Sequence, residues 1–409
     1  MWRNPRRKKV RKKSEAGLIF QGLWSTIRNG NSIRKQTAKK GTVMRISVKK
    51  DVLLKALQKV CNIIGSRTTL PILANVLVET GEDGKLTFTT TDLELRISTR
   101  IEADVQEAGA TTIPAKRFLG LVSKFKNDDV VIETNENHHS RITCGTAEFM
   151  LLGLDPRDFP APVAFEPQRK LKLKQADFSR IIDRISYAAS FDDARKFLHG
   201  ILLSVKEGNL TAVATDGKRL ALVEKLLDEA PEGSDGDIII TIKAAAEAKR
   251  MMEKEGEILI EIGSNQVIFR IGDTVITSKL IEGAYPQYRQ VIPTAFSKQV
   301  ELPCRAFVDA LEIVSIPLFD SSAYVKLTFS ANQLKFEANS INIGEGHETI
   351  PVEYGFEDVS VSFNPQFLAD PFKRLDVEKV TLKMNDAMSP IAIKSDDGFL
   401  YVIMPMRKN

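Results

Sequence analysis

The segment MRISVKKDVLLKALQKV (residues 44–60) recurs twice in altered form, as RKLKLKQADFSRIIDRI (169–185) and KQVELPCRAFVDALEIV (298–314). Each copy begins with alternating apolar and polar residues, which is typical of a strand, and continues with apolar residues at helical spacing. In the first copy Leu53, Leu57 and Val60 fall on one helix face, so that face should be buried. Self-similarity at a period of about 126 residues predicts three copies of one domain.

Each third of the chain is itself duplicated. The second halves read TTIPAKRFLGLVSKF (111–125), DIIITIKAAAEAKRMM (237–252) and DVSVSFNPQFLADPFKRL (358–375). Between the helices, alternating segments such as 85–91, 209–214 and 333–338 are bounded by Gly, Asn and Asp, which is typical of antiparallel meanders. Each third ends in a hairpin with a glycine, and Gly145, Gly272 and Gly398 are 127 and 126 residues apart. These glycines fix the register of the repeat.

The repeats predict an α+β chain of three tandem, pseudo-duplicated strand-helix-meander domains. We place these domains at residues 44–166, 167–296 and 297–409, after an extension of residues 1–43. Six helices are expected, at 50–61, 115–126, 174–187, 243–254, 303–315 and 365–376. Pro371 lies within the last of them, where a proline should kink or shorten the helix.

Residues 1–43 differ from the rest of the chain in charge. They contain 13 Lys or Arg against one acid, Glu15, and both tryptophans, Trp2 and Trp24. We interpret them as a basic, disordered N-terminal extension. A translation start placed too far upstream explains them equally well. An organellar presequence is a further alternative, although its apolar stretch, Gly17 to Trp24, is short.

The composition excludes whole classes of protein. With 409 residues, 43% of them hydrophobic and 27% charged, and no apolar run near the roughly 18 residues that span a bilayer, the chain reads as globular. Membrane insertion and wholesale disorder are excluded. Cys61, Cys144 and Cys304 are odd in number and far apart, so they predict neither a disulfide framework nor a zinc site and fit a reducing cytoplasm.

Basic charge is concentrated on the expected helices. The whole chain carries +5 and the extension +12, so residues 44–409 carry −7; the six helical windows hold 17 basic and 9 acidic residues, a net of +8. A solvated helix face explains any single pair, yet the sum over six helices favours a polyanion facing them. If two chains close head to tail, their twelve helices, about 10 Å apart, lie on a circle. Once the helix radii are subtracted, this circle encloses a clear hole of about 28 Å, which is wide enough for a DNA duplex.

Five short stretches also resemble a known family. They are IGSRTTLPILAN (64–75), TTTDLEL (89–95), AVATDGKRLAL (212–222), TSKLIEGAYPQYRQVIP (277–293) and YVIMPMRKN (401–409). They closely resemble the bacterial DNA polymerase III β subunit, the sliding clamp, over residues 44–409. The resemblance implies a DNA clamp fold, in which two chains close a homodimeric ring with helices inside, around duplex DNA, and sheets outside.

The resemblance also implies function and partners. It implies a cytoplasmic, nucleoid-associated processivity factor that is not an enzyme and needs no cofactor. It tethers the replicative polymerase and repair proteins through short peptide motifs and is placed on DNA by a clamp loader. The DNA-contacting positions correspond to Arg67, Lys116, Asp192, Lys196 and Phe197. Asp192 departs from the amide usual there, and Lys196 and Phe197 replace a tyrosine pair.

Two protein interfaces are implied as well. The partner-peptide cleft corresponds to Leu198, Thr215, Gly217, Lys218, Arg219, Leu220, Pro286, Val291, Asn364, Phe367, Met388, Pro390, Val402, Met404, Pro405, Met406 and Arg407. Lys218 departs from a histidine found in some relatives. The dimer seam pairs Phe149 and Leu151 of one chain with Ile313 and Val314 of the other.

The sequence gives little support to the hypothesis of an enzyme. The sequence contains no GxxxxGK[ST], GxGxxG or CxxC motif, which argues against a nucleotidase, a dehydrogenase or a zinc enzyme. Asp92 with Glu94 is read as a solvated strand edge, and His138 with His139 as a polar hairpin tip that could hold a metal. Two alternatives remain open, a hydrolase with a split active site and a scaffold that binds partners without forming a ring.

Overall fold

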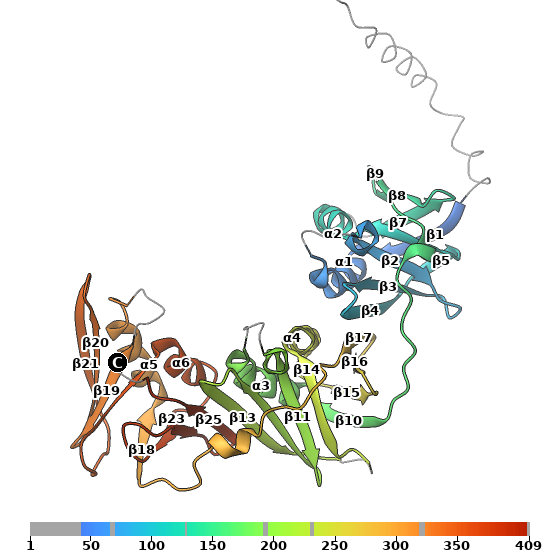
Figure 1. Ribbon diagram of the computed structural model, residues 1–409. Helices are drawn as coiled ribbons and strands as arrows, with labels where there is room; N and C mark the ends of the chain where they lie inside the picture. The colour runs from blue at the N-terminus through green and yellow to red at the C-terminus, as the bar shows by residue number, and fades with distance from the viewer. Residues whose placement is uncertain are drawn as a thin grey trace, which may run out of the picture.

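A computed structural model describes residues 42–65, 70–126, 129–190, 195–229, 233–318 and 324–406. Three domains follow one another along an open arc, with the helices on its inner side and the sheets on its outer side (Figure 1). The described helices are α1 (Lys50–Val60), α2 (Ala115–Lys124), α3 (Gln175–Ile185), α4 (Ile242–Met251), α5 (Cys304–Val314) and α6 (Pro365–Phe372). They pack as the pairs α1 with α2, α3 with α4 and α5 with α6, so each domain contributes two helices.

Four antiparallel sheets form the outer layer. The first has the strand order β5 (Asp104–Glu107), β1 (Thr42–Lys49), β7 (Asp129–Asn135), β8 (His139–Cys144) and β9 (Ala147–Leu152). The fourth has the order β21 (Gly344–Pro351), β20 (Gln333–Ser340), β19 (Val325–Ser330) and β22 (Val359–Phe363). These two sheets lie at the two ends of the arc (Figure 1).

The two larger sheets each run across a boundary between domains. One has the order β10 (Arg169–Lys174), β15 (Glu257–Ile262), β16 (Gln266–Ile271), β17 (Thr274–Lys279), β4 (Leu95–Glu102), β3 (Lys85–Thr91), β2 (Asn75–Thr80) and β6 (Ala110–Pro114). The other has the order β14 (Gly236–Thr241), β11 (Gly200–Lys206), β12 (Asn209–Thr215), β13 (Arg219–Leu226), β25 (Phe399–Ile403), β24 (Ile391–Lys394), β23 (Lys379–Met384) and β18 (Lys298–Pro303). The joins are the ladders β17–β4 and β13–β25, so neighbouring domains share a sheet.

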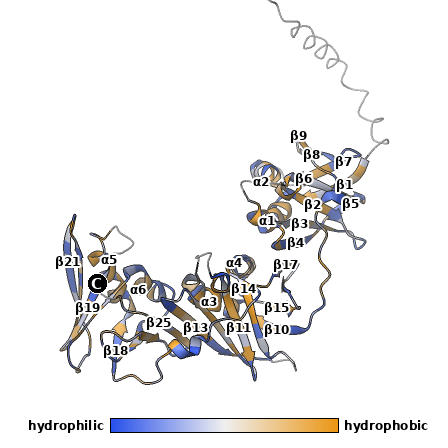
Figure 2. Cartoon of the chain, viewed as in Figure 1, coloured by the Kyte–Doolittle hydropathy of each residue, from blue (hydrophilic) through white to orange (hydrophobic). Residues whose placement is uncertain are grey.

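The core lies between the helices and the sheets. Helix α1 buries Leu53, Leu57 and Val60, as its apolar spacing predicts, and hydrophobic residues concentrate where helices meet strands (Figure 2). Helix α6 ends at Phe372 after eight residues and contains Pro371, whereas the other five helices have 10 or 11 residues. The expected shortening of the last helix is confirmed.

The three hairpin glycines adopt one conformation. Gly145, Gly272 and Gly398 have φ of 59°, 53° and 83°, which L-residues rarely adopt. They turn β8 into β9, β16 into β17 and β24 into β25. The repeat read from these glycines is therefore a repeat of backbone structure.

Candidate functional site

An apolar cleft lies where the second and third domains meet. It encloses about 300 Å³, and ten of the residues that the resemblance groups together line it: Leu198, Thr215, Gly217, Lys218, Arg219, Leu220, Pro286, Val291, Val402 and Met404. Leu198, Leu220 and Val402 are each 2% exposed and belong to its buried wall. Val291 and Met404 are 41% and 39% exposed, so they remain available to a ligand.

A tight turn between β12 and β13 shapes one side of the cleft. The Thr215 hydroxyl donates to the Arg219 carbonyl (2.6 Å), and Asp216 Oδ1 accepts from the backbone N–H groups of Lys218 (2.8 Å) and Arg219 (3.0 Å). Gly217 has φ +84°, and a Cβ there would lie 2.7 Å from Arg195 Nη1. The Met404 N–H donates to the Lys218 carbonyl (3.0 Å), which fixes the C-terminal segment against this turn.

Arg219 ties the second domain to the third beneath the cleft. Its guanidinium donates to Asp216 (3.1 Å), to the Tyr187 carbonyl (2.6 Å) and to Asp370 on α6. It also lies 4.1 Å from the centroid of the Phe367 ring. Burial opposes the charged form, but Tyr401, Asp370 and Asp216 outweigh it and hold the Arg219 pKa above its ordinary value. Arg219 is therefore a buried junction residue more than a contact for a ligand.

Other predicted cleft residues lie outside this cavity. Asn364 caps α6 by accepting from the N–H groups of Gln366 (2.9 Å) and Phe367 (3.1 Å). The rest of this group comprises Phe367, Met388, Pro390, Pro405 and Met406, of which Met388 is 64% exposed. Arg407 lies beyond the described residues.

Four residues line the cleft without having been assigned to it: Arg195, Phe197, Gln287 and Tyr288. Phe197 was expected at DNA, and its ring instead packs beside the apolar group that includes Leu220 and Val402. Tyr288 belongs to the same stretch as Pro286 and Val291, so membership of that stretch was an available signal.

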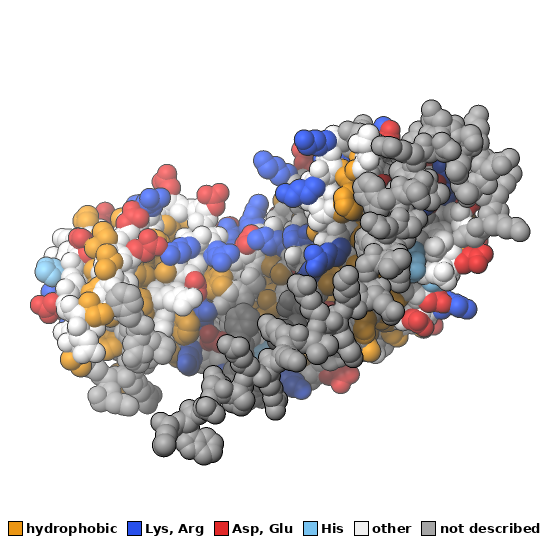
Figure 3. Space-filling view, turned by 90° about the horizontal axis from the view of Figure 1, so that it is seen from above, with side chains coloured by type: hydrophobic (Ala, Val, Ile, Leu, Met, Phe, Trp, Pro, Cys, Tyr) orange, Lys and Arg blue, Asp and Glu red, His pale blue; other side chains and the backbone are white. Residues whose placement is uncertain are grey.

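The inner face of the arc carries the basic helices. When this face is viewed from above, Lys and Arg side chains form a band across its middle (Figure 3). Acidic side chains are more frequent toward the end of the arc that bears α5. In the third domain Arg305 pairs with Asp309 and Lys373 with Glu312. On α1 and α2, Lys55 and Lys124 are exposed, and the described residues offer them no ion pair. Uncompensated positive charge is thus greatest in the first domain.

The expected DNA contacts are only partly covered by the structure. Lys116 lies in the first turn of α2, is exposed, and donates to the Gly65 carbonyl (3.2 Å). Lys196 is exposed in a short turn, Lys196–His199. Arg67 and Asp192 lie outside the described residues.

Each end of the arc has a strand edge with no partner among the described strands. These edges are β9 in the first sheet and β21 in the fourth. Phe149 and Met150 on β9 are 45% and 49% exposed, and Ile313 on α5 is 55% exposed. Leu151 is half-buried, and Val314 is 1% exposed with its side chain in the core. Of the residues expected at the dimer seam, Val314 does not reach the surface of the single chain.

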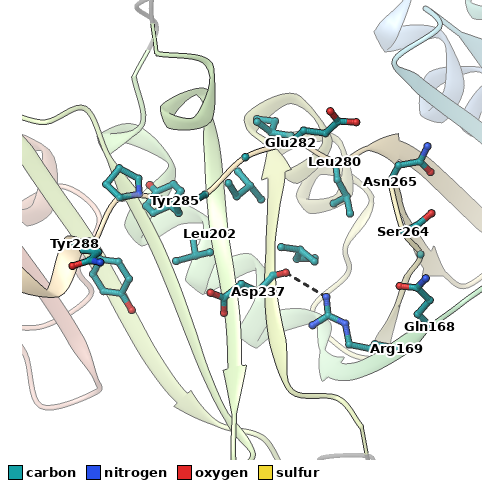
Figure 4. A pocket seen from close by; sticks show the side chains of 18 of the residues that line it. Gln168, Arg169, Leu202, Asp237, Ser264, Asn265, Leu280, Glu282, Tyr285 and Tyr288 are labelled. Atoms are coloured by element: carbon teal, nitrogen blue, oxygen red, sulfur yellow. Dashed lines mark hydrogen bonds between the residues drawn. The ribbon is translucent and has the colours of Figure 1, made fainter.

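A larger hollow of about 640 Å³ lies on the other side of the segment that bounds the cleft. Leu280, Tyr285 and Tyr288 of this segment stand along it, with Leu202 and Asp237 below them, and the Glu282 carboxylate points away (Figure 4). The Arg169 guanidinium donates to the carbonyls of Asp235 (3.2 Å) and Asp237 (3.3 Å), so this charge fixes a turn. The residues of this hollow do not form a catalytic constellation.

The described residues offer little for other chemistry. Within the described ranges, no three His, Cys, Asp or Glu side chains could hold a metal ion, the hairpin of His138 and His139 included. The three cysteines are buried, and burial raises the pKa of Cys61 to about 12, which disfavours the reactive thiolate. No described helix is long and apolar enough to cross a membrane.

Comparison with known proteins gives one consistent result. Residues 44–163, 172–287 and 289–407 match, in order, the N-terminal, central and C-terminal domains of the DNA polymerase III beta subunit. The beta sliding clamp of Chlamydia muridarum is 33% identical over 364 residues, which cover 89% of this chain and 99% of the relative. The beta sliding clamp of Salmonella typhimurium is 32% identical over 369 residues, covering 89% and 100%.

Solved structures agree with the sequence matches. The sliding clamp from Bartonella birtlesii bound to griselimycin has a TM-score of 0.85 at 30% identity, covering 89% of this chain and all of that one. The clamp from Bacillus subtilis has a TM-score of 0.85 at 26% identity, covering 90% and 100%. With three domains in one arc, basic helices inside and continuous sheets outside, the chain belongs to the bacterial beta sliding clamps, the non-catalytic processivity factors of DNA polymerase III.

Proposed function

We propose that two copies of this chain close head to tail into a ring around duplex DNA, with β9 of each copy pairing with β21 of the other. The observation that carries this proposal is the pair of shared sheets. Strand β17 ends the second half of domain 2 and pairs with β4, and β25 ends the second half of domain 3 and pairs with β13. Strand β9 ends the second half of domain 1 and, within the described chain, pairs only with β8.

The sheet order supports the same pairing. Joining β9 to β21 would give the run β1, β7, β8, β9, β21, β20, β19, β22, which has the plan of the two larger sheets. An open strand edge with exposed apolar side chains invites pairing with another chain. Phe149 on β9 and Ile313 on α5, which packs against β21, are exposed at these ends. Two unlike ends that meet head to tail can form a closed ring.

Solution mass tests the ring. The unaltered protein should have twice the 45.6 kDa of one chain by light scattering, and the double variant Phe149→Glu, Ile313→Glu should have the mass of one chain. Leu226→Glu is the matched control, since Leu226 is 72% exposed on β13, away from both edges. A double variant that keeps twice the chain mass would place the seam elsewhere.

We also propose that the inner face of the arc contacts DNA phosphates through Lys116 and Lys196, and through Arg67 at the position given by the family. Direct binding should be weak and fall steeply with salt, because displaced counterions drive it. Protein loaded by a clamp loader should stay on circular DNA in high salt and slide off linear DNA. Equal loss from both would argue against encirclement. A protein that encircles DNA in this way would act at the nucleoid in the cytoplasm.

The cleft between domains 2 and 3 is proposed as the site for short peptides of the replicative polymerase and of repair proteins. Its apolar wall and adaptable Met404 suit apolar anchor residues of varied shape. Met404→Ala or removal of residues 405–409 should weaken binding of a labelled polymerase C-terminal peptide by about tenfold or more. Met388→Ala is the control, because Met388 is exposed and does not line the cavity.

We retain domain boundaries at 44–166, 167–296 and 297–409, after the extension of residues 1–43. Segments that begin and end at these positions should survive limited proteolysis, since exposed links between domains are cut first. Cleavage inside a sheet ahead of cleavage near residues 166 and 296 would contradict these boundaries.

A further inference from the structure

A groove at the junction of domains 1 and 2 repeats the plan of the cleft at the junction of domains 2 and 3. It encloses about 310 Å³ between the β3–β4 turn, β17 and the segment that follows residue 159. Pro160, Phe165 and Ile268 line it, and Leu93 and Val163 are 48% and 68% exposed at its mouth. The groove is therefore open and largely apolar.

The backbone of the two sites corresponds hydrogen bond by hydrogen bond. The Thr91 hydroxyl donates to the Leu95 carbonyl (2.9 Å), as Thr215 does to Arg219. Asp92 Oδ1 accepts from the N–H groups of Glu94 (3.0 Å) and Leu95 (2.7 Å), as Asp216 does from Lys218 and Arg219.

The strand that crosses the junction corresponds as well. The Lys279 N–H donates to the Glu94 carbonyl (3.2 Å), as Met404 does to Lys218. The groove thus repeats the hydrogen bonds that shape the cleft between domains 2 and 3.

Side chains at the rim differ between the two copies. Glu94 takes the place of Lys218, so the charge at this point is inverted, and no ion pair to the Glu94 carboxylate is found within the described residues. Lys279 takes the place of Met404. The Arg96 guanidinium donates to the Pro160 carbonyl (2.7 Å) and lies 5.6 Å from the Phe159 ring, which holds the far wall in place. Glu94 should favour an apolar segment flanked by positive charge, whereas Lys279 opposes it.

The N-terminal extension contains a segment of that composition. Residues 17–24 read GLIFQGLW, the longest apolar stretch among the first 43 residues, and its flanks carry Lys12, Lys13 and Arg28 against one acid, Glu15. An apolar stretch between cations matches a groove whose unpaired rim carboxylate is Glu94. The cleft between domains 2 and 3 presents Lys218 at the same point, so charge favours the groove.

The segment can reach the groove within one chain. Seventeen residues, 25–41, separate Trp24 from the start of β1 at Thr42, and extended chain spans about 55–60 Å over that length. A domain the size of residues 44–163 has a radius of gyration of about 14 Å, so a path over half its surface is about 55 Å. Domain 1 supplies both β1 and the β3–β4 turn of the groove.

We propose that the groove between the β3–β4 turn and β17 binds the apolar segment Gly17 to Trp24 of the same chain. The inference goes beyond the processivity function and does not depend on which proteins bind the cleft between domains 2 and 3. The groove acts as an internal docking site that ties the basic extension to the junction of domains 1 and 2.

Tryptophan fluorescence tests the proposal in the full chain. The chain has two tryptophans, both in the extension, so Trp2→Phe leaves Trp24 as the only reporter. Trp24 emission should be shifted to the blue, and acrylamide quenching should be severalfold weaker than in the urea-unfolded chain. Leu93→Asp and Val163→Asp should each restore strong quenching, and Glu94→Lys should do so in part. Leu93 and Val163 are exposed, so folding is not at risk.

Matched variants identify the site that holds the segment. Met404→Asp changes the other cleft at the position of Lys279 and should leave Trp24 protected, while Lys279→Met should strengthen protection. Protection should not change on dilution, because the contact is within one chain. Strong quenching in the unaltered chain would overturn the proposal. So would protection lost in Met404→Asp but kept in Leu93→Asp, or protection lost on dilution.

Discussion

The two domain junctions, between domains 1 and 2 and between domains 2 and 3, share the same turn and strand pairing. They differ in the side chains that cross the boundary. At the second junction Arg219 is 9% exposed and donates across the boundary to Asp370. At the first junction the corresponding residue is Leu95, which is 2% exposed, and the boundary is crossed by an ion pair between Asp92 and the half-exposed Lys243. One repeat therefore fixes where strands and turns lie, while a few side chains decide how firmly each junction is held and what its hollow accepts.

Replacing the buried Arg219 should change the stability of the junction of domains 2 and 3 more than any other substitution discussed below. Arg219→Met leaves Asp370 and Asp216 poorly solvated, and loss of one partner of a buried ion pair costs about 3–5 kcal/mol. Solvent reaches Asp370, whose side chain is 19% exposed, so we expect about 3 kcal/mol of lost free energy of unfolding at this junction. Native-state hydrogen exchange should show it as lost protection on β13 and β25.

Leu95→Met is the control at the first junction. A volume-conserving apolar exchange costs less than about 1.5 kcal/mol, so β4 and β17 should keep most of their protection. Equal losses at both junctions would mean that the arginine does not distinguish them.

The sequence predicted most of the fold because the fold is repeated. Alternation at 85–91 and apolar spacing at 50–61 correspond to β3 and α1 within a residue, and the hairpin glycines set the register of all three domains. The joins β17–β4 and β13–β25 could not be predicted in the same way, because pairing between strands about 180 residues apart leaves no local pattern.

The site was predicted less completely than the fold. Ten of the residues that the resemblance groups together line one cleft, and all of them except Leu198 lie in a stretch such as TDGKRL or AYPQY that resembles the family. Burial of Val314 was already present in the helical spacing of α5, since Phe307, Leu311 and Val314 share one face. The groove of Leu93 and Val163 depends on contact between two domains, so no single stretch indicates it.

Exchanging the residues Leu93 and Gly217 of the two turns should have a smaller effect on the stability of each junction. Leu93 and Gly217 hold the same position with φ of 77° and 84°, a conformation that costs a side chain about 1–2 kcal/mol. Gly217→Leu should destabilise the second junction by about that amount and weaken peptide binding, because the new side chain meets Arg195.

The reverse exchange, Leu93→Gly, should relieve the strain at the first junction. The gain should be below about 1 kcal/mol, because the added freedom of the unfolded glycine offsets part of it. Thermal unfolding of both variants and an isothermal peptide titration would measure these effects. A neutral Gly217→Leu would show that the turn tolerates side chains at both junctions.

Low pH should produce the smallest difference in stability between the two junctions. Asp397, in the turn between β24 and β25, accepts from Arg184 of domain 2 (2.5 Å). Burial alone would raise the Asp397 pKa, but the hydrogen bonds from Arg184 and Ser395 outweigh it and lower that pKa below its usual value. A carboxyl with a lowered folded pKa stabilises the fold above its unfolded pKa of about 3.9, and this stability is lost as the pH falls through the folded pKa. Protection on β13 and β25 should therefore decline below about pH 4.

The size of the acid effect follows from exposure. The Asp397 side chain is 37% exposed, so solvent screens the pair and we expect less than about 1 kcal/mol. Asp397→Asn should remove this pH-dependent part at the second junction. Asp155 gives the contrast, because its pKa is lowered to about 2 chiefly by hydrogen bonds from Arg157, two residues along the chain, and no domain boundary is crossed. Asp155→Asn should leave the acid profile of both junctions unchanged, and a profile that moved equally in the two variants would assign the effect to local turns instead of the junction.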